Sequence, residues 1–168
     1  WQHFFPDDKF SHLTTEYLQP KFTTEVENDN YFIAGHVIAN EEIVSAINSL
    51  STGEALKHDK EIIAFRGSME SFTAQGFSGI KDFNGDVISI HWLYDIFTLN
   101  DAVMESDFRL ITAGRKSQTL SQTNTVIGNE TFEDGTPKIF IEEGATVEGA
   151  FLNVTKGVIY IGKDSEIM

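Results

Sequence analysis

The chain has 168 residues, of which 40% are hydrophobic and 12% aromatic, a composition typical of folded globular proteins and not of disordered ones. Its formal net charge of -14 argues against nucleic acid and anionic membrane surfaces as partners, because no excess of cations could neutralise their phosphates. It contains no cysteine, which excludes disulfides and thiolate metal sites, and no apolar run approaches the about 20 residues of a bilayer span.

Residues 10–38 predict a strand, a helix and a second strand. Residues 10–13 form a short apolar run, and Thr14 or Thr15 could cap a helix that Pro20 limits. The apolar stretch YFIAGHVIA then has the length of a strand, interrupted by Gly35. A continuous apolar strand is typical of a sheet covered on both faces, as in α/β proteins.

The segment EEIVSAINSL predicts a helix. Its apolar residues recur at helical spacing, and Asn40 precedes it as an N-cap. Two hairpins are expected next, one in EALKHDKEIIAFRG and one in GIKDFNGDVISI, where Asn84-Gly85 is a strong turn pattern. SMESFTAQGF, between them, could form a short helix.

Residues 92–113 again show a helical pattern, with Asn100 as a second N-cap and Gly114 as the stop. The polar stretch GRKSQTLSQTNT follows. We therefore expect a domain boundary near Ser121, with one domain over residues 1–120 and another over residues 121–168.

The last 30 residues contain a short repeat. An aliphatic residue occurs six positions after another in Ile141 to Val147 and again in Ile161 to Ile167. This spacing suits a three-sided solenoid with these residues in one inward-facing column, although ordinary β-hairpins would also fit. One coil cannot cover its own inward row, so we expect the chain to be a segment of a longer protein.

Several stretches carry a family resemblance that covers nearly the whole chain. YDIFTLNDAVMESDFRLITAGRKS, GRKSQTLSQTNTVIG, IFIEEGATVEGAFLN and GVIYIGKDSEIM resemble bacterial sugar-phosphate nucleotidyltransferases fused to a hexapeptide-repeat acyltransferase. These are similar to the bifunctional N-acetylglucosamine-1-phosphate uridylyltransferase/glucosamine-1-phosphate acetyltransferase. The resemblance implies an α/β fold, with an incomplete Rossmann-like nucleotidyltransferase domain followed by the first coil of a left-handed parallel β-helix.

The same resemblance implies a central segment of a cytoplasmic transferase of sugar-nucleotide biosynthesis, one that forms UDP-N-acetylglucosamine. Mg²⁺ and acetyl-CoA are the cofactors expected for the full-length family, and neither can be assigned to residues of this segment. A sugar phosphate and a nucleoside triphosphate are the implied partners, with a homotrimer formed through the β-helix. The family's glycine-rich phosphate loop does not occur here, so we expect the segment alone to be inactive.

Four residues are candidates for substrate binding: Gly35, His36, Arg115 and Asn124. Gly35-His36 ends an apolar strand, where related enzymes have a Gly-Asp pair whose carboxylate binds Mg²⁺. Imidazole is a poor ligand for that ion, so His36 could contact phosphate or sugar, or could simply be a histidine at the edge of the core.

Arg115 offers a bidentate fork for a phosphate, or compensates a helix dipole, and Asn124 could order the turn between the domains. His3, His12, His58 and His91 show no ligand spacing, so no metal ligand and no catalytic residue is assigned. Two rival functions remain open: a non-catalytic module that binds or senses a sugar nucleotide, and a scaffold for an acyltransferase only.

Overall fold

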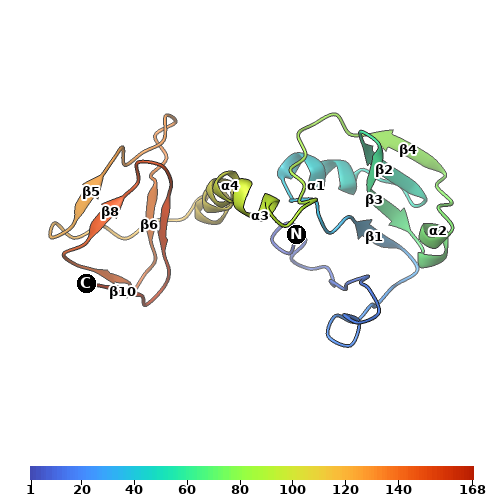
Figure 1. The fold of residues 1–168 in the computed structure, drawn as a ribbon, viewed down its shortest axis with the longest axis horizontal. Helices are drawn as coiled ribbons and strands as arrows, with labels where there is room; N and C mark the ends of the chain where they lie inside the picture. Colours follow the sequence, from blue (N-terminus) through green and yellow to red (C-terminus); the bar gives the residue numbers. More distant parts are fainter. The chain divides into compact units, whose positions relative to one another are not determined.

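The structure is a computed structural model that describes residues 1–168. The chain divides into two compact units, Trp1–His91 and Trp92–Met168, and each is described by itself (Figure 1). This division lies upstream of the boundary expected near Ser121, because the helical residues 95–112 contact the residues that follow: Arg109 donates to Asp134 and lies over the Phe132 ring. None of the helices has both the length and the apolar character that crossing a membrane would need.

The first unit is built on a four-stranded mixed sheet of order β1-β3-β2-β4. Its strands are β1 (Asn30–Ile33), β2 (Glu54–His58), β3 (Glu61–Gly67) and β4 (Gly79–Asp82). β3 runs antiparallel to both β1 and β2, and β4 runs parallel to β2. The predicted hairpin of β2 and β3 is confirmed, and Asp59 in its turn has a positive φ of 52°, which aspartate tolerates better than most residues.

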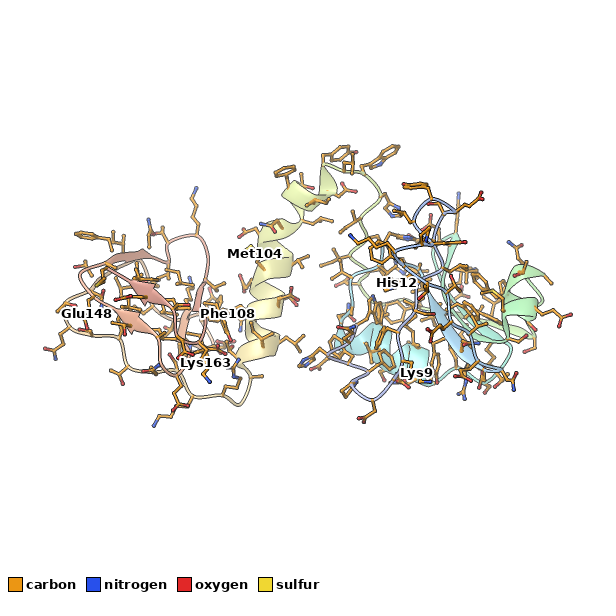
Figure 2. The ribbon with its side chains drawn as sticks, turned by 90° about the horizontal axis from the view of Figure 1, so that it is seen from below. Lys9, His12, Met104, Phe108, Glu148 and Lys163 are labelled. Carbon is orange, nitrogen blue, oxygen red and sulfur yellow. The ribbon has the colours of Figure 1, made fainter.

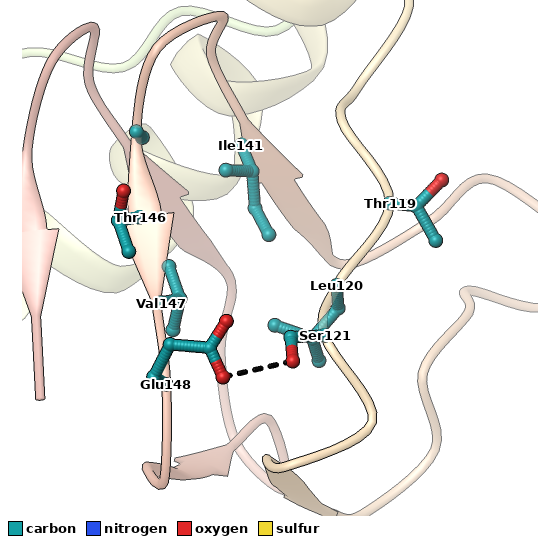
Figure 3. A pocket seen from close by; sticks show the side chains of 8 residues that line it. Thr119, Leu120, Ser121, Ile141, Thr146, Val147 and Glu148 are labelled. Atoms are coloured by element: carbon teal, nitrogen blue, oxygen red, sulfur yellow. Dashed lines mark hydrogen bonds between the residues drawn. The ribbon is translucent and has the colours of Figure 1, made fainter.

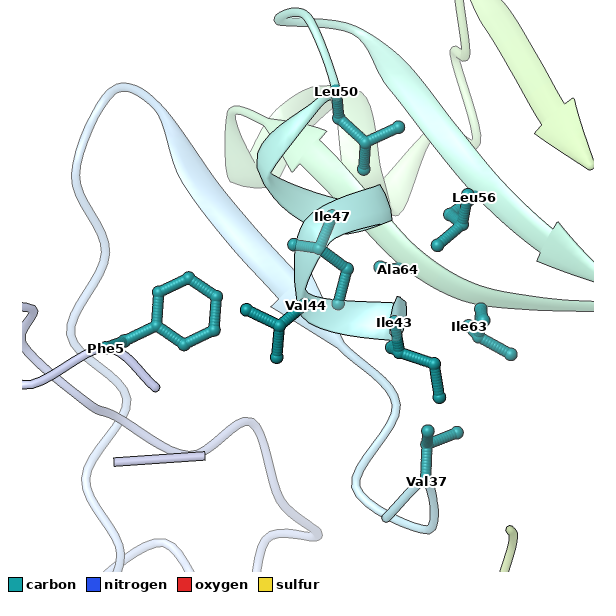
Figure 4. Packing of buried hydrophobic residues seen from close by; sticks show 9 residues of the cluster. All are labelled: Phe5, Val37, Ile43, Val44, Ile47, Leu50, Leu56, Ile63 and Ala64. Carbon is teal, nitrogen blue, oxygen red and sulfur yellow. The ribbon is translucent and has the colours of Figure 1, made fainter. Parts of the chain in front are cut away.

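Helix α1 (Glu41–Asn48) covers one face of this sheet, and the prediction of a helix capped by Asn40 is confirmed. The Asn40 side chain accepts a hydrogen bond from the Ile43 amide at 2.8 Å. Ile43 and Ile47 are completely buried against Leu56 and Ala64 of the sheet (Figure 4). Burial of this apolar stripe, about 1.5–3 kcal/mol for each large side chain, holds the helix on the sheet.

An aromatic cluster covers the other face. Cross-strand neighbours Phe32 and Phe65 point to the side opposite α1, where Phe72 and Phe77 join them. Phe72 lies on the short helix α2 (Met69–Thr73), which the sequence predicted, and stacks on Phe32 with ring centroids 4.3 Å apart. The sheet is therefore covered on both faces.

Two expectations for the first unit are wrong. Residues 16–21 form turns and not a helix, because His12 bonds to Thr23 and Thr24 and closes the segment into a loop. No strand occurs at residues 10–13. Asn84-Gly85 does not turn a hairpin: β4 pairs with β2, and the residues after the turn pair with residues 36–38 through the Val37–Ser89 bridge.

The second unit begins with helices α3 (Asp95–Thr98) and α4 (Asn100–Thr112). Asn100 is not the N-cap: Leu99 holds that position without a side-chain bond, because the chain passes almost directly from one helix to the next. Gly114, with a φ of 70°, follows the helix as expected. Phe108 is 3% exposed and lies on the side of α4 that faces the strands, whereas Met104 is 52% exposed (Figure 2).

Three two-stranded parallel pairs follow. They are formed by β5 (Thr125–Ile127) with β8 (Phe151–Asn153), β6 (Ile139–Ile141) with β9 (Ile159–Ile161), and β7 (Thr146–Val147) with β10 (Glu166–Ile167). The register pairs Ile141 with Ile161 and Val147 with Ile167. All four of these side chains belong to one hydrophobic cluster, as the repeat predicted, and Leu152 completes its buried part.

Candidate functional site

Gly35 and His36 lie in the turn that follows β1. This turn lies beyond Ile33 and Ala64, the last paired residues of β1 and β3, and it brings the His36 side chain to Glu61 at the start of β3. Gly35 has an ordinary backbone conformation, and a Cβ atom there would meet nothing within 4 Å. There is therefore open space at Gly35, beside His36, and packing does not require a glycine at this position.

A second strand segment brings His91 to the same place. The Ile90 amide donates to the carbonyl of His36 at 2.8 Å, and the Ile38 amide donates to Ile88 at 2.9 Å. These two backbone bonds fix the chain on either side of the Val37–Ser89 bridge. The imidazoles of His36 and His91 are in contact as a result, with ring centroids 4.9 Å apart.

The three side chains His36, Glu61 and His91 form a compact group, which we call the histidine–glutamate trio. Their donor atoms all lie within 4.8 Å of one another. His36 Nε2 is 3.4 Å from Glu61 Oε2, yet this nitrogen is buried and has no hydrogen-bond partner. Glu61 and His91 are exposed, so the trio is open to solvent on one side.

The trio does not fit Mg²⁺, the ion expected from the family. Mg²⁺ requires near-octahedral oxygen ligands and usually keeps several waters, whereas two of the three donors here are imidazole nitrogens. Any Mg²⁺ used in nucleotidyl transfer would need other ligands.

Arg115 lies after α4 in the second unit, where it contacts β6 and β9. Its guanidinium donates to the carboxylate of Glu142 and, at 3.0 Å, to the hydroxyl of Tyr160 and the carbonyl of Ile111. Tyr160 also donates to Glu142, and these bonds lower the pKa of Glu142 to about 2. The fork of Arg115 therefore already holds a carboxylate and a helix-terminal carbonyl, and a phosphate would have to compete with both.

Asn124 orders a turn in the same unit. Its side-chain amide donates to the carbonyls of Ser121 and Val147, at 3.1 and 2.7 Å, and its Oδ1 accepts from the Ala150 amide at 2.9 Å. The bonds to Val147 and Ala150 join residues 23 and 26 apart in sequence, because β5 lies beside β8. Each polar atom of this side chain is thus engaged with the backbone.

A small pocket of about 160 Å³ lies between residues 119–121 and residues 141–148 (Figure 3). Glu148 is at its edge, and the Ser121 hydroxyl donates to that carboxylate at 2.9 Å. Hydrogen bonds from Thr123 and Ser121 lower the pKa of Glu148, so this wall of the pocket carries a negative charge. A phosphate group would be repelled there.

The four predicted candidates fall into two places: Gly35 and His36 in the first unit, Arg115 and Asn124 in the second. Sequence analysis missed Glu61 and His91 as neighbours of His36. No sequence pattern could have revealed them, since the three residues are separated by 25 and 30 positions and meet only through strand pairing. Glu142 and Tyr160 were likewise missed as the partners of Arg115.

Comparison with known families decides the assignment for most of the chain. A family model described as sugar nucleotidyl transferase matches residues 1–116. The chain belongs to the sugar nucleotidyl transferase family. No curated protein and no solved structure gives a match.

Membership in the sugar nucleotidyl transferase family supports nucleotidyl transfer on sugars as the general activity and a transferase as the class of enzyme. The matched region includes the histidine–glutamate trio, α3 and α4, and ends at Lys116. It stops before the parallel strand pairs, which the family assignment does not cover.

Proposed function

We propose that residues 1–168 belong to an enzyme that transfers a nucleotidyl group from a nucleoside triphosphate to a sugar 1-phosphate, and that the product is UDP-N-acetylglucosamine. The match of residues 1–116 to the sugar nucleotidyl transferase family carries the proposal. In this reaction a phosphate oxygen of the sugar attacks the α-phosphorus of UTP. A new P–O bond forms at the α-phosphorus, and the bond between this phosphorus and the oxygen that bridges it to the β-phosphorus breaks. Pyrophosphate leaves with that oxygen.

Residues 1–120 would form an incomplete Rossmann-like domain in this proposal. The mixed sheet covered by α1 and by the aromatic cluster supports an α/β domain. Gly35 and His36 at the end of β1 would border the substrate, in keeping with the open space beside Gly35.

Residues 121–168 would form the first coil of a left-handed parallel β-helix. Three successive parallel pairs support this proposal, and so does the register that places Ile141 beside Ile161 and Val147 beside Ile167. Such a β-helix would trimerise and would transfer an acetyl group from acetyl-CoA to an amino sugar phosphate in the cytoplasm. Arg115 and Asn124 would then position the start of the coil through Glu142 and Val147.

A specific observation favours a second candidate, a module that binds a sugar nucleotide without turnover. By the resemblance described above, His36 would occupy the position of a carboxylate that binds Mg²⁺ in related enzymes, and the trio around it does not fit that ion. A third candidate is a scaffold for an acyltransferase only.

Two assays distinguish the three candidate functions, which are the nucleotidyltransferase, the binding module and the acyltransferase scaffold. With the full-length protein that contains this chain, pyrophosphate release is measured from UTP and N-acetylglucosamine 1-phosphate, with ATP, CTP and GTP as control nucleotides. Thiol release is measured from acetyl-CoA and glucosamine 1-phosphate. Pyrophosphate release with UTP supports the proposed enzyme. Absence of release refutes it; retained thiol release then selects the scaffold, and saturable binding of UDP-N-acetylglucosamine without either activity selects the binding module.

A further inference from the structure

We infer that His36, Glu61 and His91 form a binding site for a divalent transition-metal ion of the zinc type. The site goes beyond the proposed function, because nucleotidyl transfer as described above places His36 beside the substrate but assigns no metal ion to it and no role to Glu61 or His91. Two imidazole nitrogens and one carboxylate oxygen are a donor set that suits Zn²⁺ and related first-row ions.

The geometry of the trio favours a shared ion over a simple ion pair. A hydrogen bond between a ring nitrogen and a carboxylate oxygen is about 2.7–3.2 Å long, whereas His36 Nε2 and Glu61 Oε2 are 3.4 Å apart and unbonded. Two ligand atoms that each lie about 2.0–2.1 Å from a tetrahedral zinc ion are separated by about 3.4 Å. The observed separation therefore equals that of two ligands on one ion.

The buried nitrogen of His36 points to the same conclusion. Leaving a buried polar atom without a partner costs about 1–3 kcal/mol, so such an atom calls for an explanation. His36 Nε2 is buried and without a hydrogen bond, although Glu61 and His91 place donor atoms within 4.8 Å of it. A metal ion between the three would satisfy this nitrogen.

Backbone hydrogen bonds hold the three ligand residues close together without a bound ion. The turn after β1 brings His36 to Glu61 at the start of β3, and the bond from the Ile90 amide to the His36 carbonyl holds the neighbouring His91 beside them. The three ligands thus come from segments that strand pairing holds together, which lowers the entropy lost on binding. With three protein ligands and exposed positions at Glu61 and His91, the fourth coordination position faces solvent, as in zinc sites that accept water or a substrate.

Titration of the untagged chain, first stripped with a chelator, tests the inference. Zn²⁺ binding is followed by calorimetry, and Co²⁺ binding by its visible d–d absorption, which reports coordination geometry. We expect one equivalent of each ion to bind, a rise in the thermal midpoint with Zn²⁺, and no such rise with Mg²⁺ at the same concentration.

The variants Glu61→Gln and His91→Gln should each weaken Zn²⁺ binding at least about 10-fold, since even loss of an outer partner of a metal ligand costs 10–100-fold. Both positions are exposed, so these substitutions leave the core intact. His12→Gln is the matched control: this histidine is exposed and contacts only the Phe22 ring with its imidazole.

The inference is overturned if Zn²⁺ shows no saturable binding of one equivalent. It is also overturned if Glu61→Gln and His91→Gln bind Zn²⁺ as tightly as His12→Gln does. Neither result depends on transferase activity, so failure of the metal site and failure of the proposed function are separate outcomes.

Discussion

The two units of the chain are stabilised in different ways. In the first, a sheet is packed on both faces by large apolar side chains, and Ile43, Ile47 and Phe65 are completely buried. In the second, strands of two or three residues pair in parallel around a cluster with only four buried members.

Polar side chains compensate for the smaller cluster. Arg115, Glu142 and Tyr160 form one network, and Asn124 bonds to three backbone groups. The first unit is stabilised mainly by apolar packing, because its sheet is wide enough to bury side chains on both faces. The second unit relies more on side-chain hydrogen bonds, because its strands are too short to bury as much apolar surface.

The largest expected effect is in the aromatic cluster of the first unit. Phe65→Ala removes a fully buried ring that contacts Phe32, Phe72 and Phe77, and should lower the free energy of unfolding of this unit by about 3–5 kcal/mol. Hydrogen exchange of the β3 amides under denaturant measures it. Phe151→Ala, at a ring that is 76% exposed in the second unit, is the control. If the two substitutions lowered the free energy of unfolding of their units equally, apolar packing would not distinguish the first unit from the second.

A pH-dependent effect is expected in the second unit. Because the folded pKa of Glu142 is lowered to about 2 from 4.5, its ionised form stabilises this unit above about pH 4.5, and the stabilisation is lost as the pH falls toward 2. Glu142→Gln should lower the thermal midpoint of the unit at pH 7 and weaken its dependence on pH in that range.

Glu143→Gln provides the comparison for this experiment, since Glu143 is adjacent and exposed. NMR titration of the Glu142 carboxyl carbon gives the pKa directly. A midpoint near 4.5 would show that the network with Arg115 and Tyr160 does not hold the ionised form.

The smallest expected effect concerns the cap of α1. Asn40→Ala removes the acceptor of the Ile43 amide and should cost about 1 kcal/mol of unfolding free energy, while Asn40→Asp, which keeps an acceptor, should cost less. Chemical denaturation measures both. Asn48→Ala, at an exposed position at the other end of the helix, is the control, and a loss as large as that of Asn40→Ala would argue against the cap.

Local sequence patterns predicted the elements whose partners are near in the chain. The apolar spacing and the cap of α1 are contained within ten residues, and β2 and β3 are joined by a two-residue turn. The Asn84-Gly85 hairpin failed because its turn pattern competed with a partner 50 residues away: residues 88–90 pair with residues 36–38 and not with β4.

The candidate site shows the same limit. His36 was identified because it follows an apolar run, a pattern that can be recognised from residues adjacent in the sequence. Its neighbours Glu61 and His91 come from the start of β3 and from the segment after the isolated bridge at Ser89, where nothing in their own surroundings predicts a ligand. Likewise, the sequence left open whether Arg115 compensates a helix terminus or binds phosphate. Its partners Glu142, just after β6, and Tyr160, in β9, lie 27 and 45 residues further on.

The sequence by itself determined the acidic charge, the stripe of α1, the turn between β2 and β3, and the repeated aliphatic residues from Ile141 to Ile167 that form one hydrophobic cluster. Each depends on the identity and spacing of residues within about one element or one repeat. Only the tertiary structure decided which histidines meet, which carboxylate engages Arg115, and which strands run beside β2 and β5. Those contacts depend on strand register, which hydrophobic burial and backbone hydrogen bonds fix together when the whole chain folds.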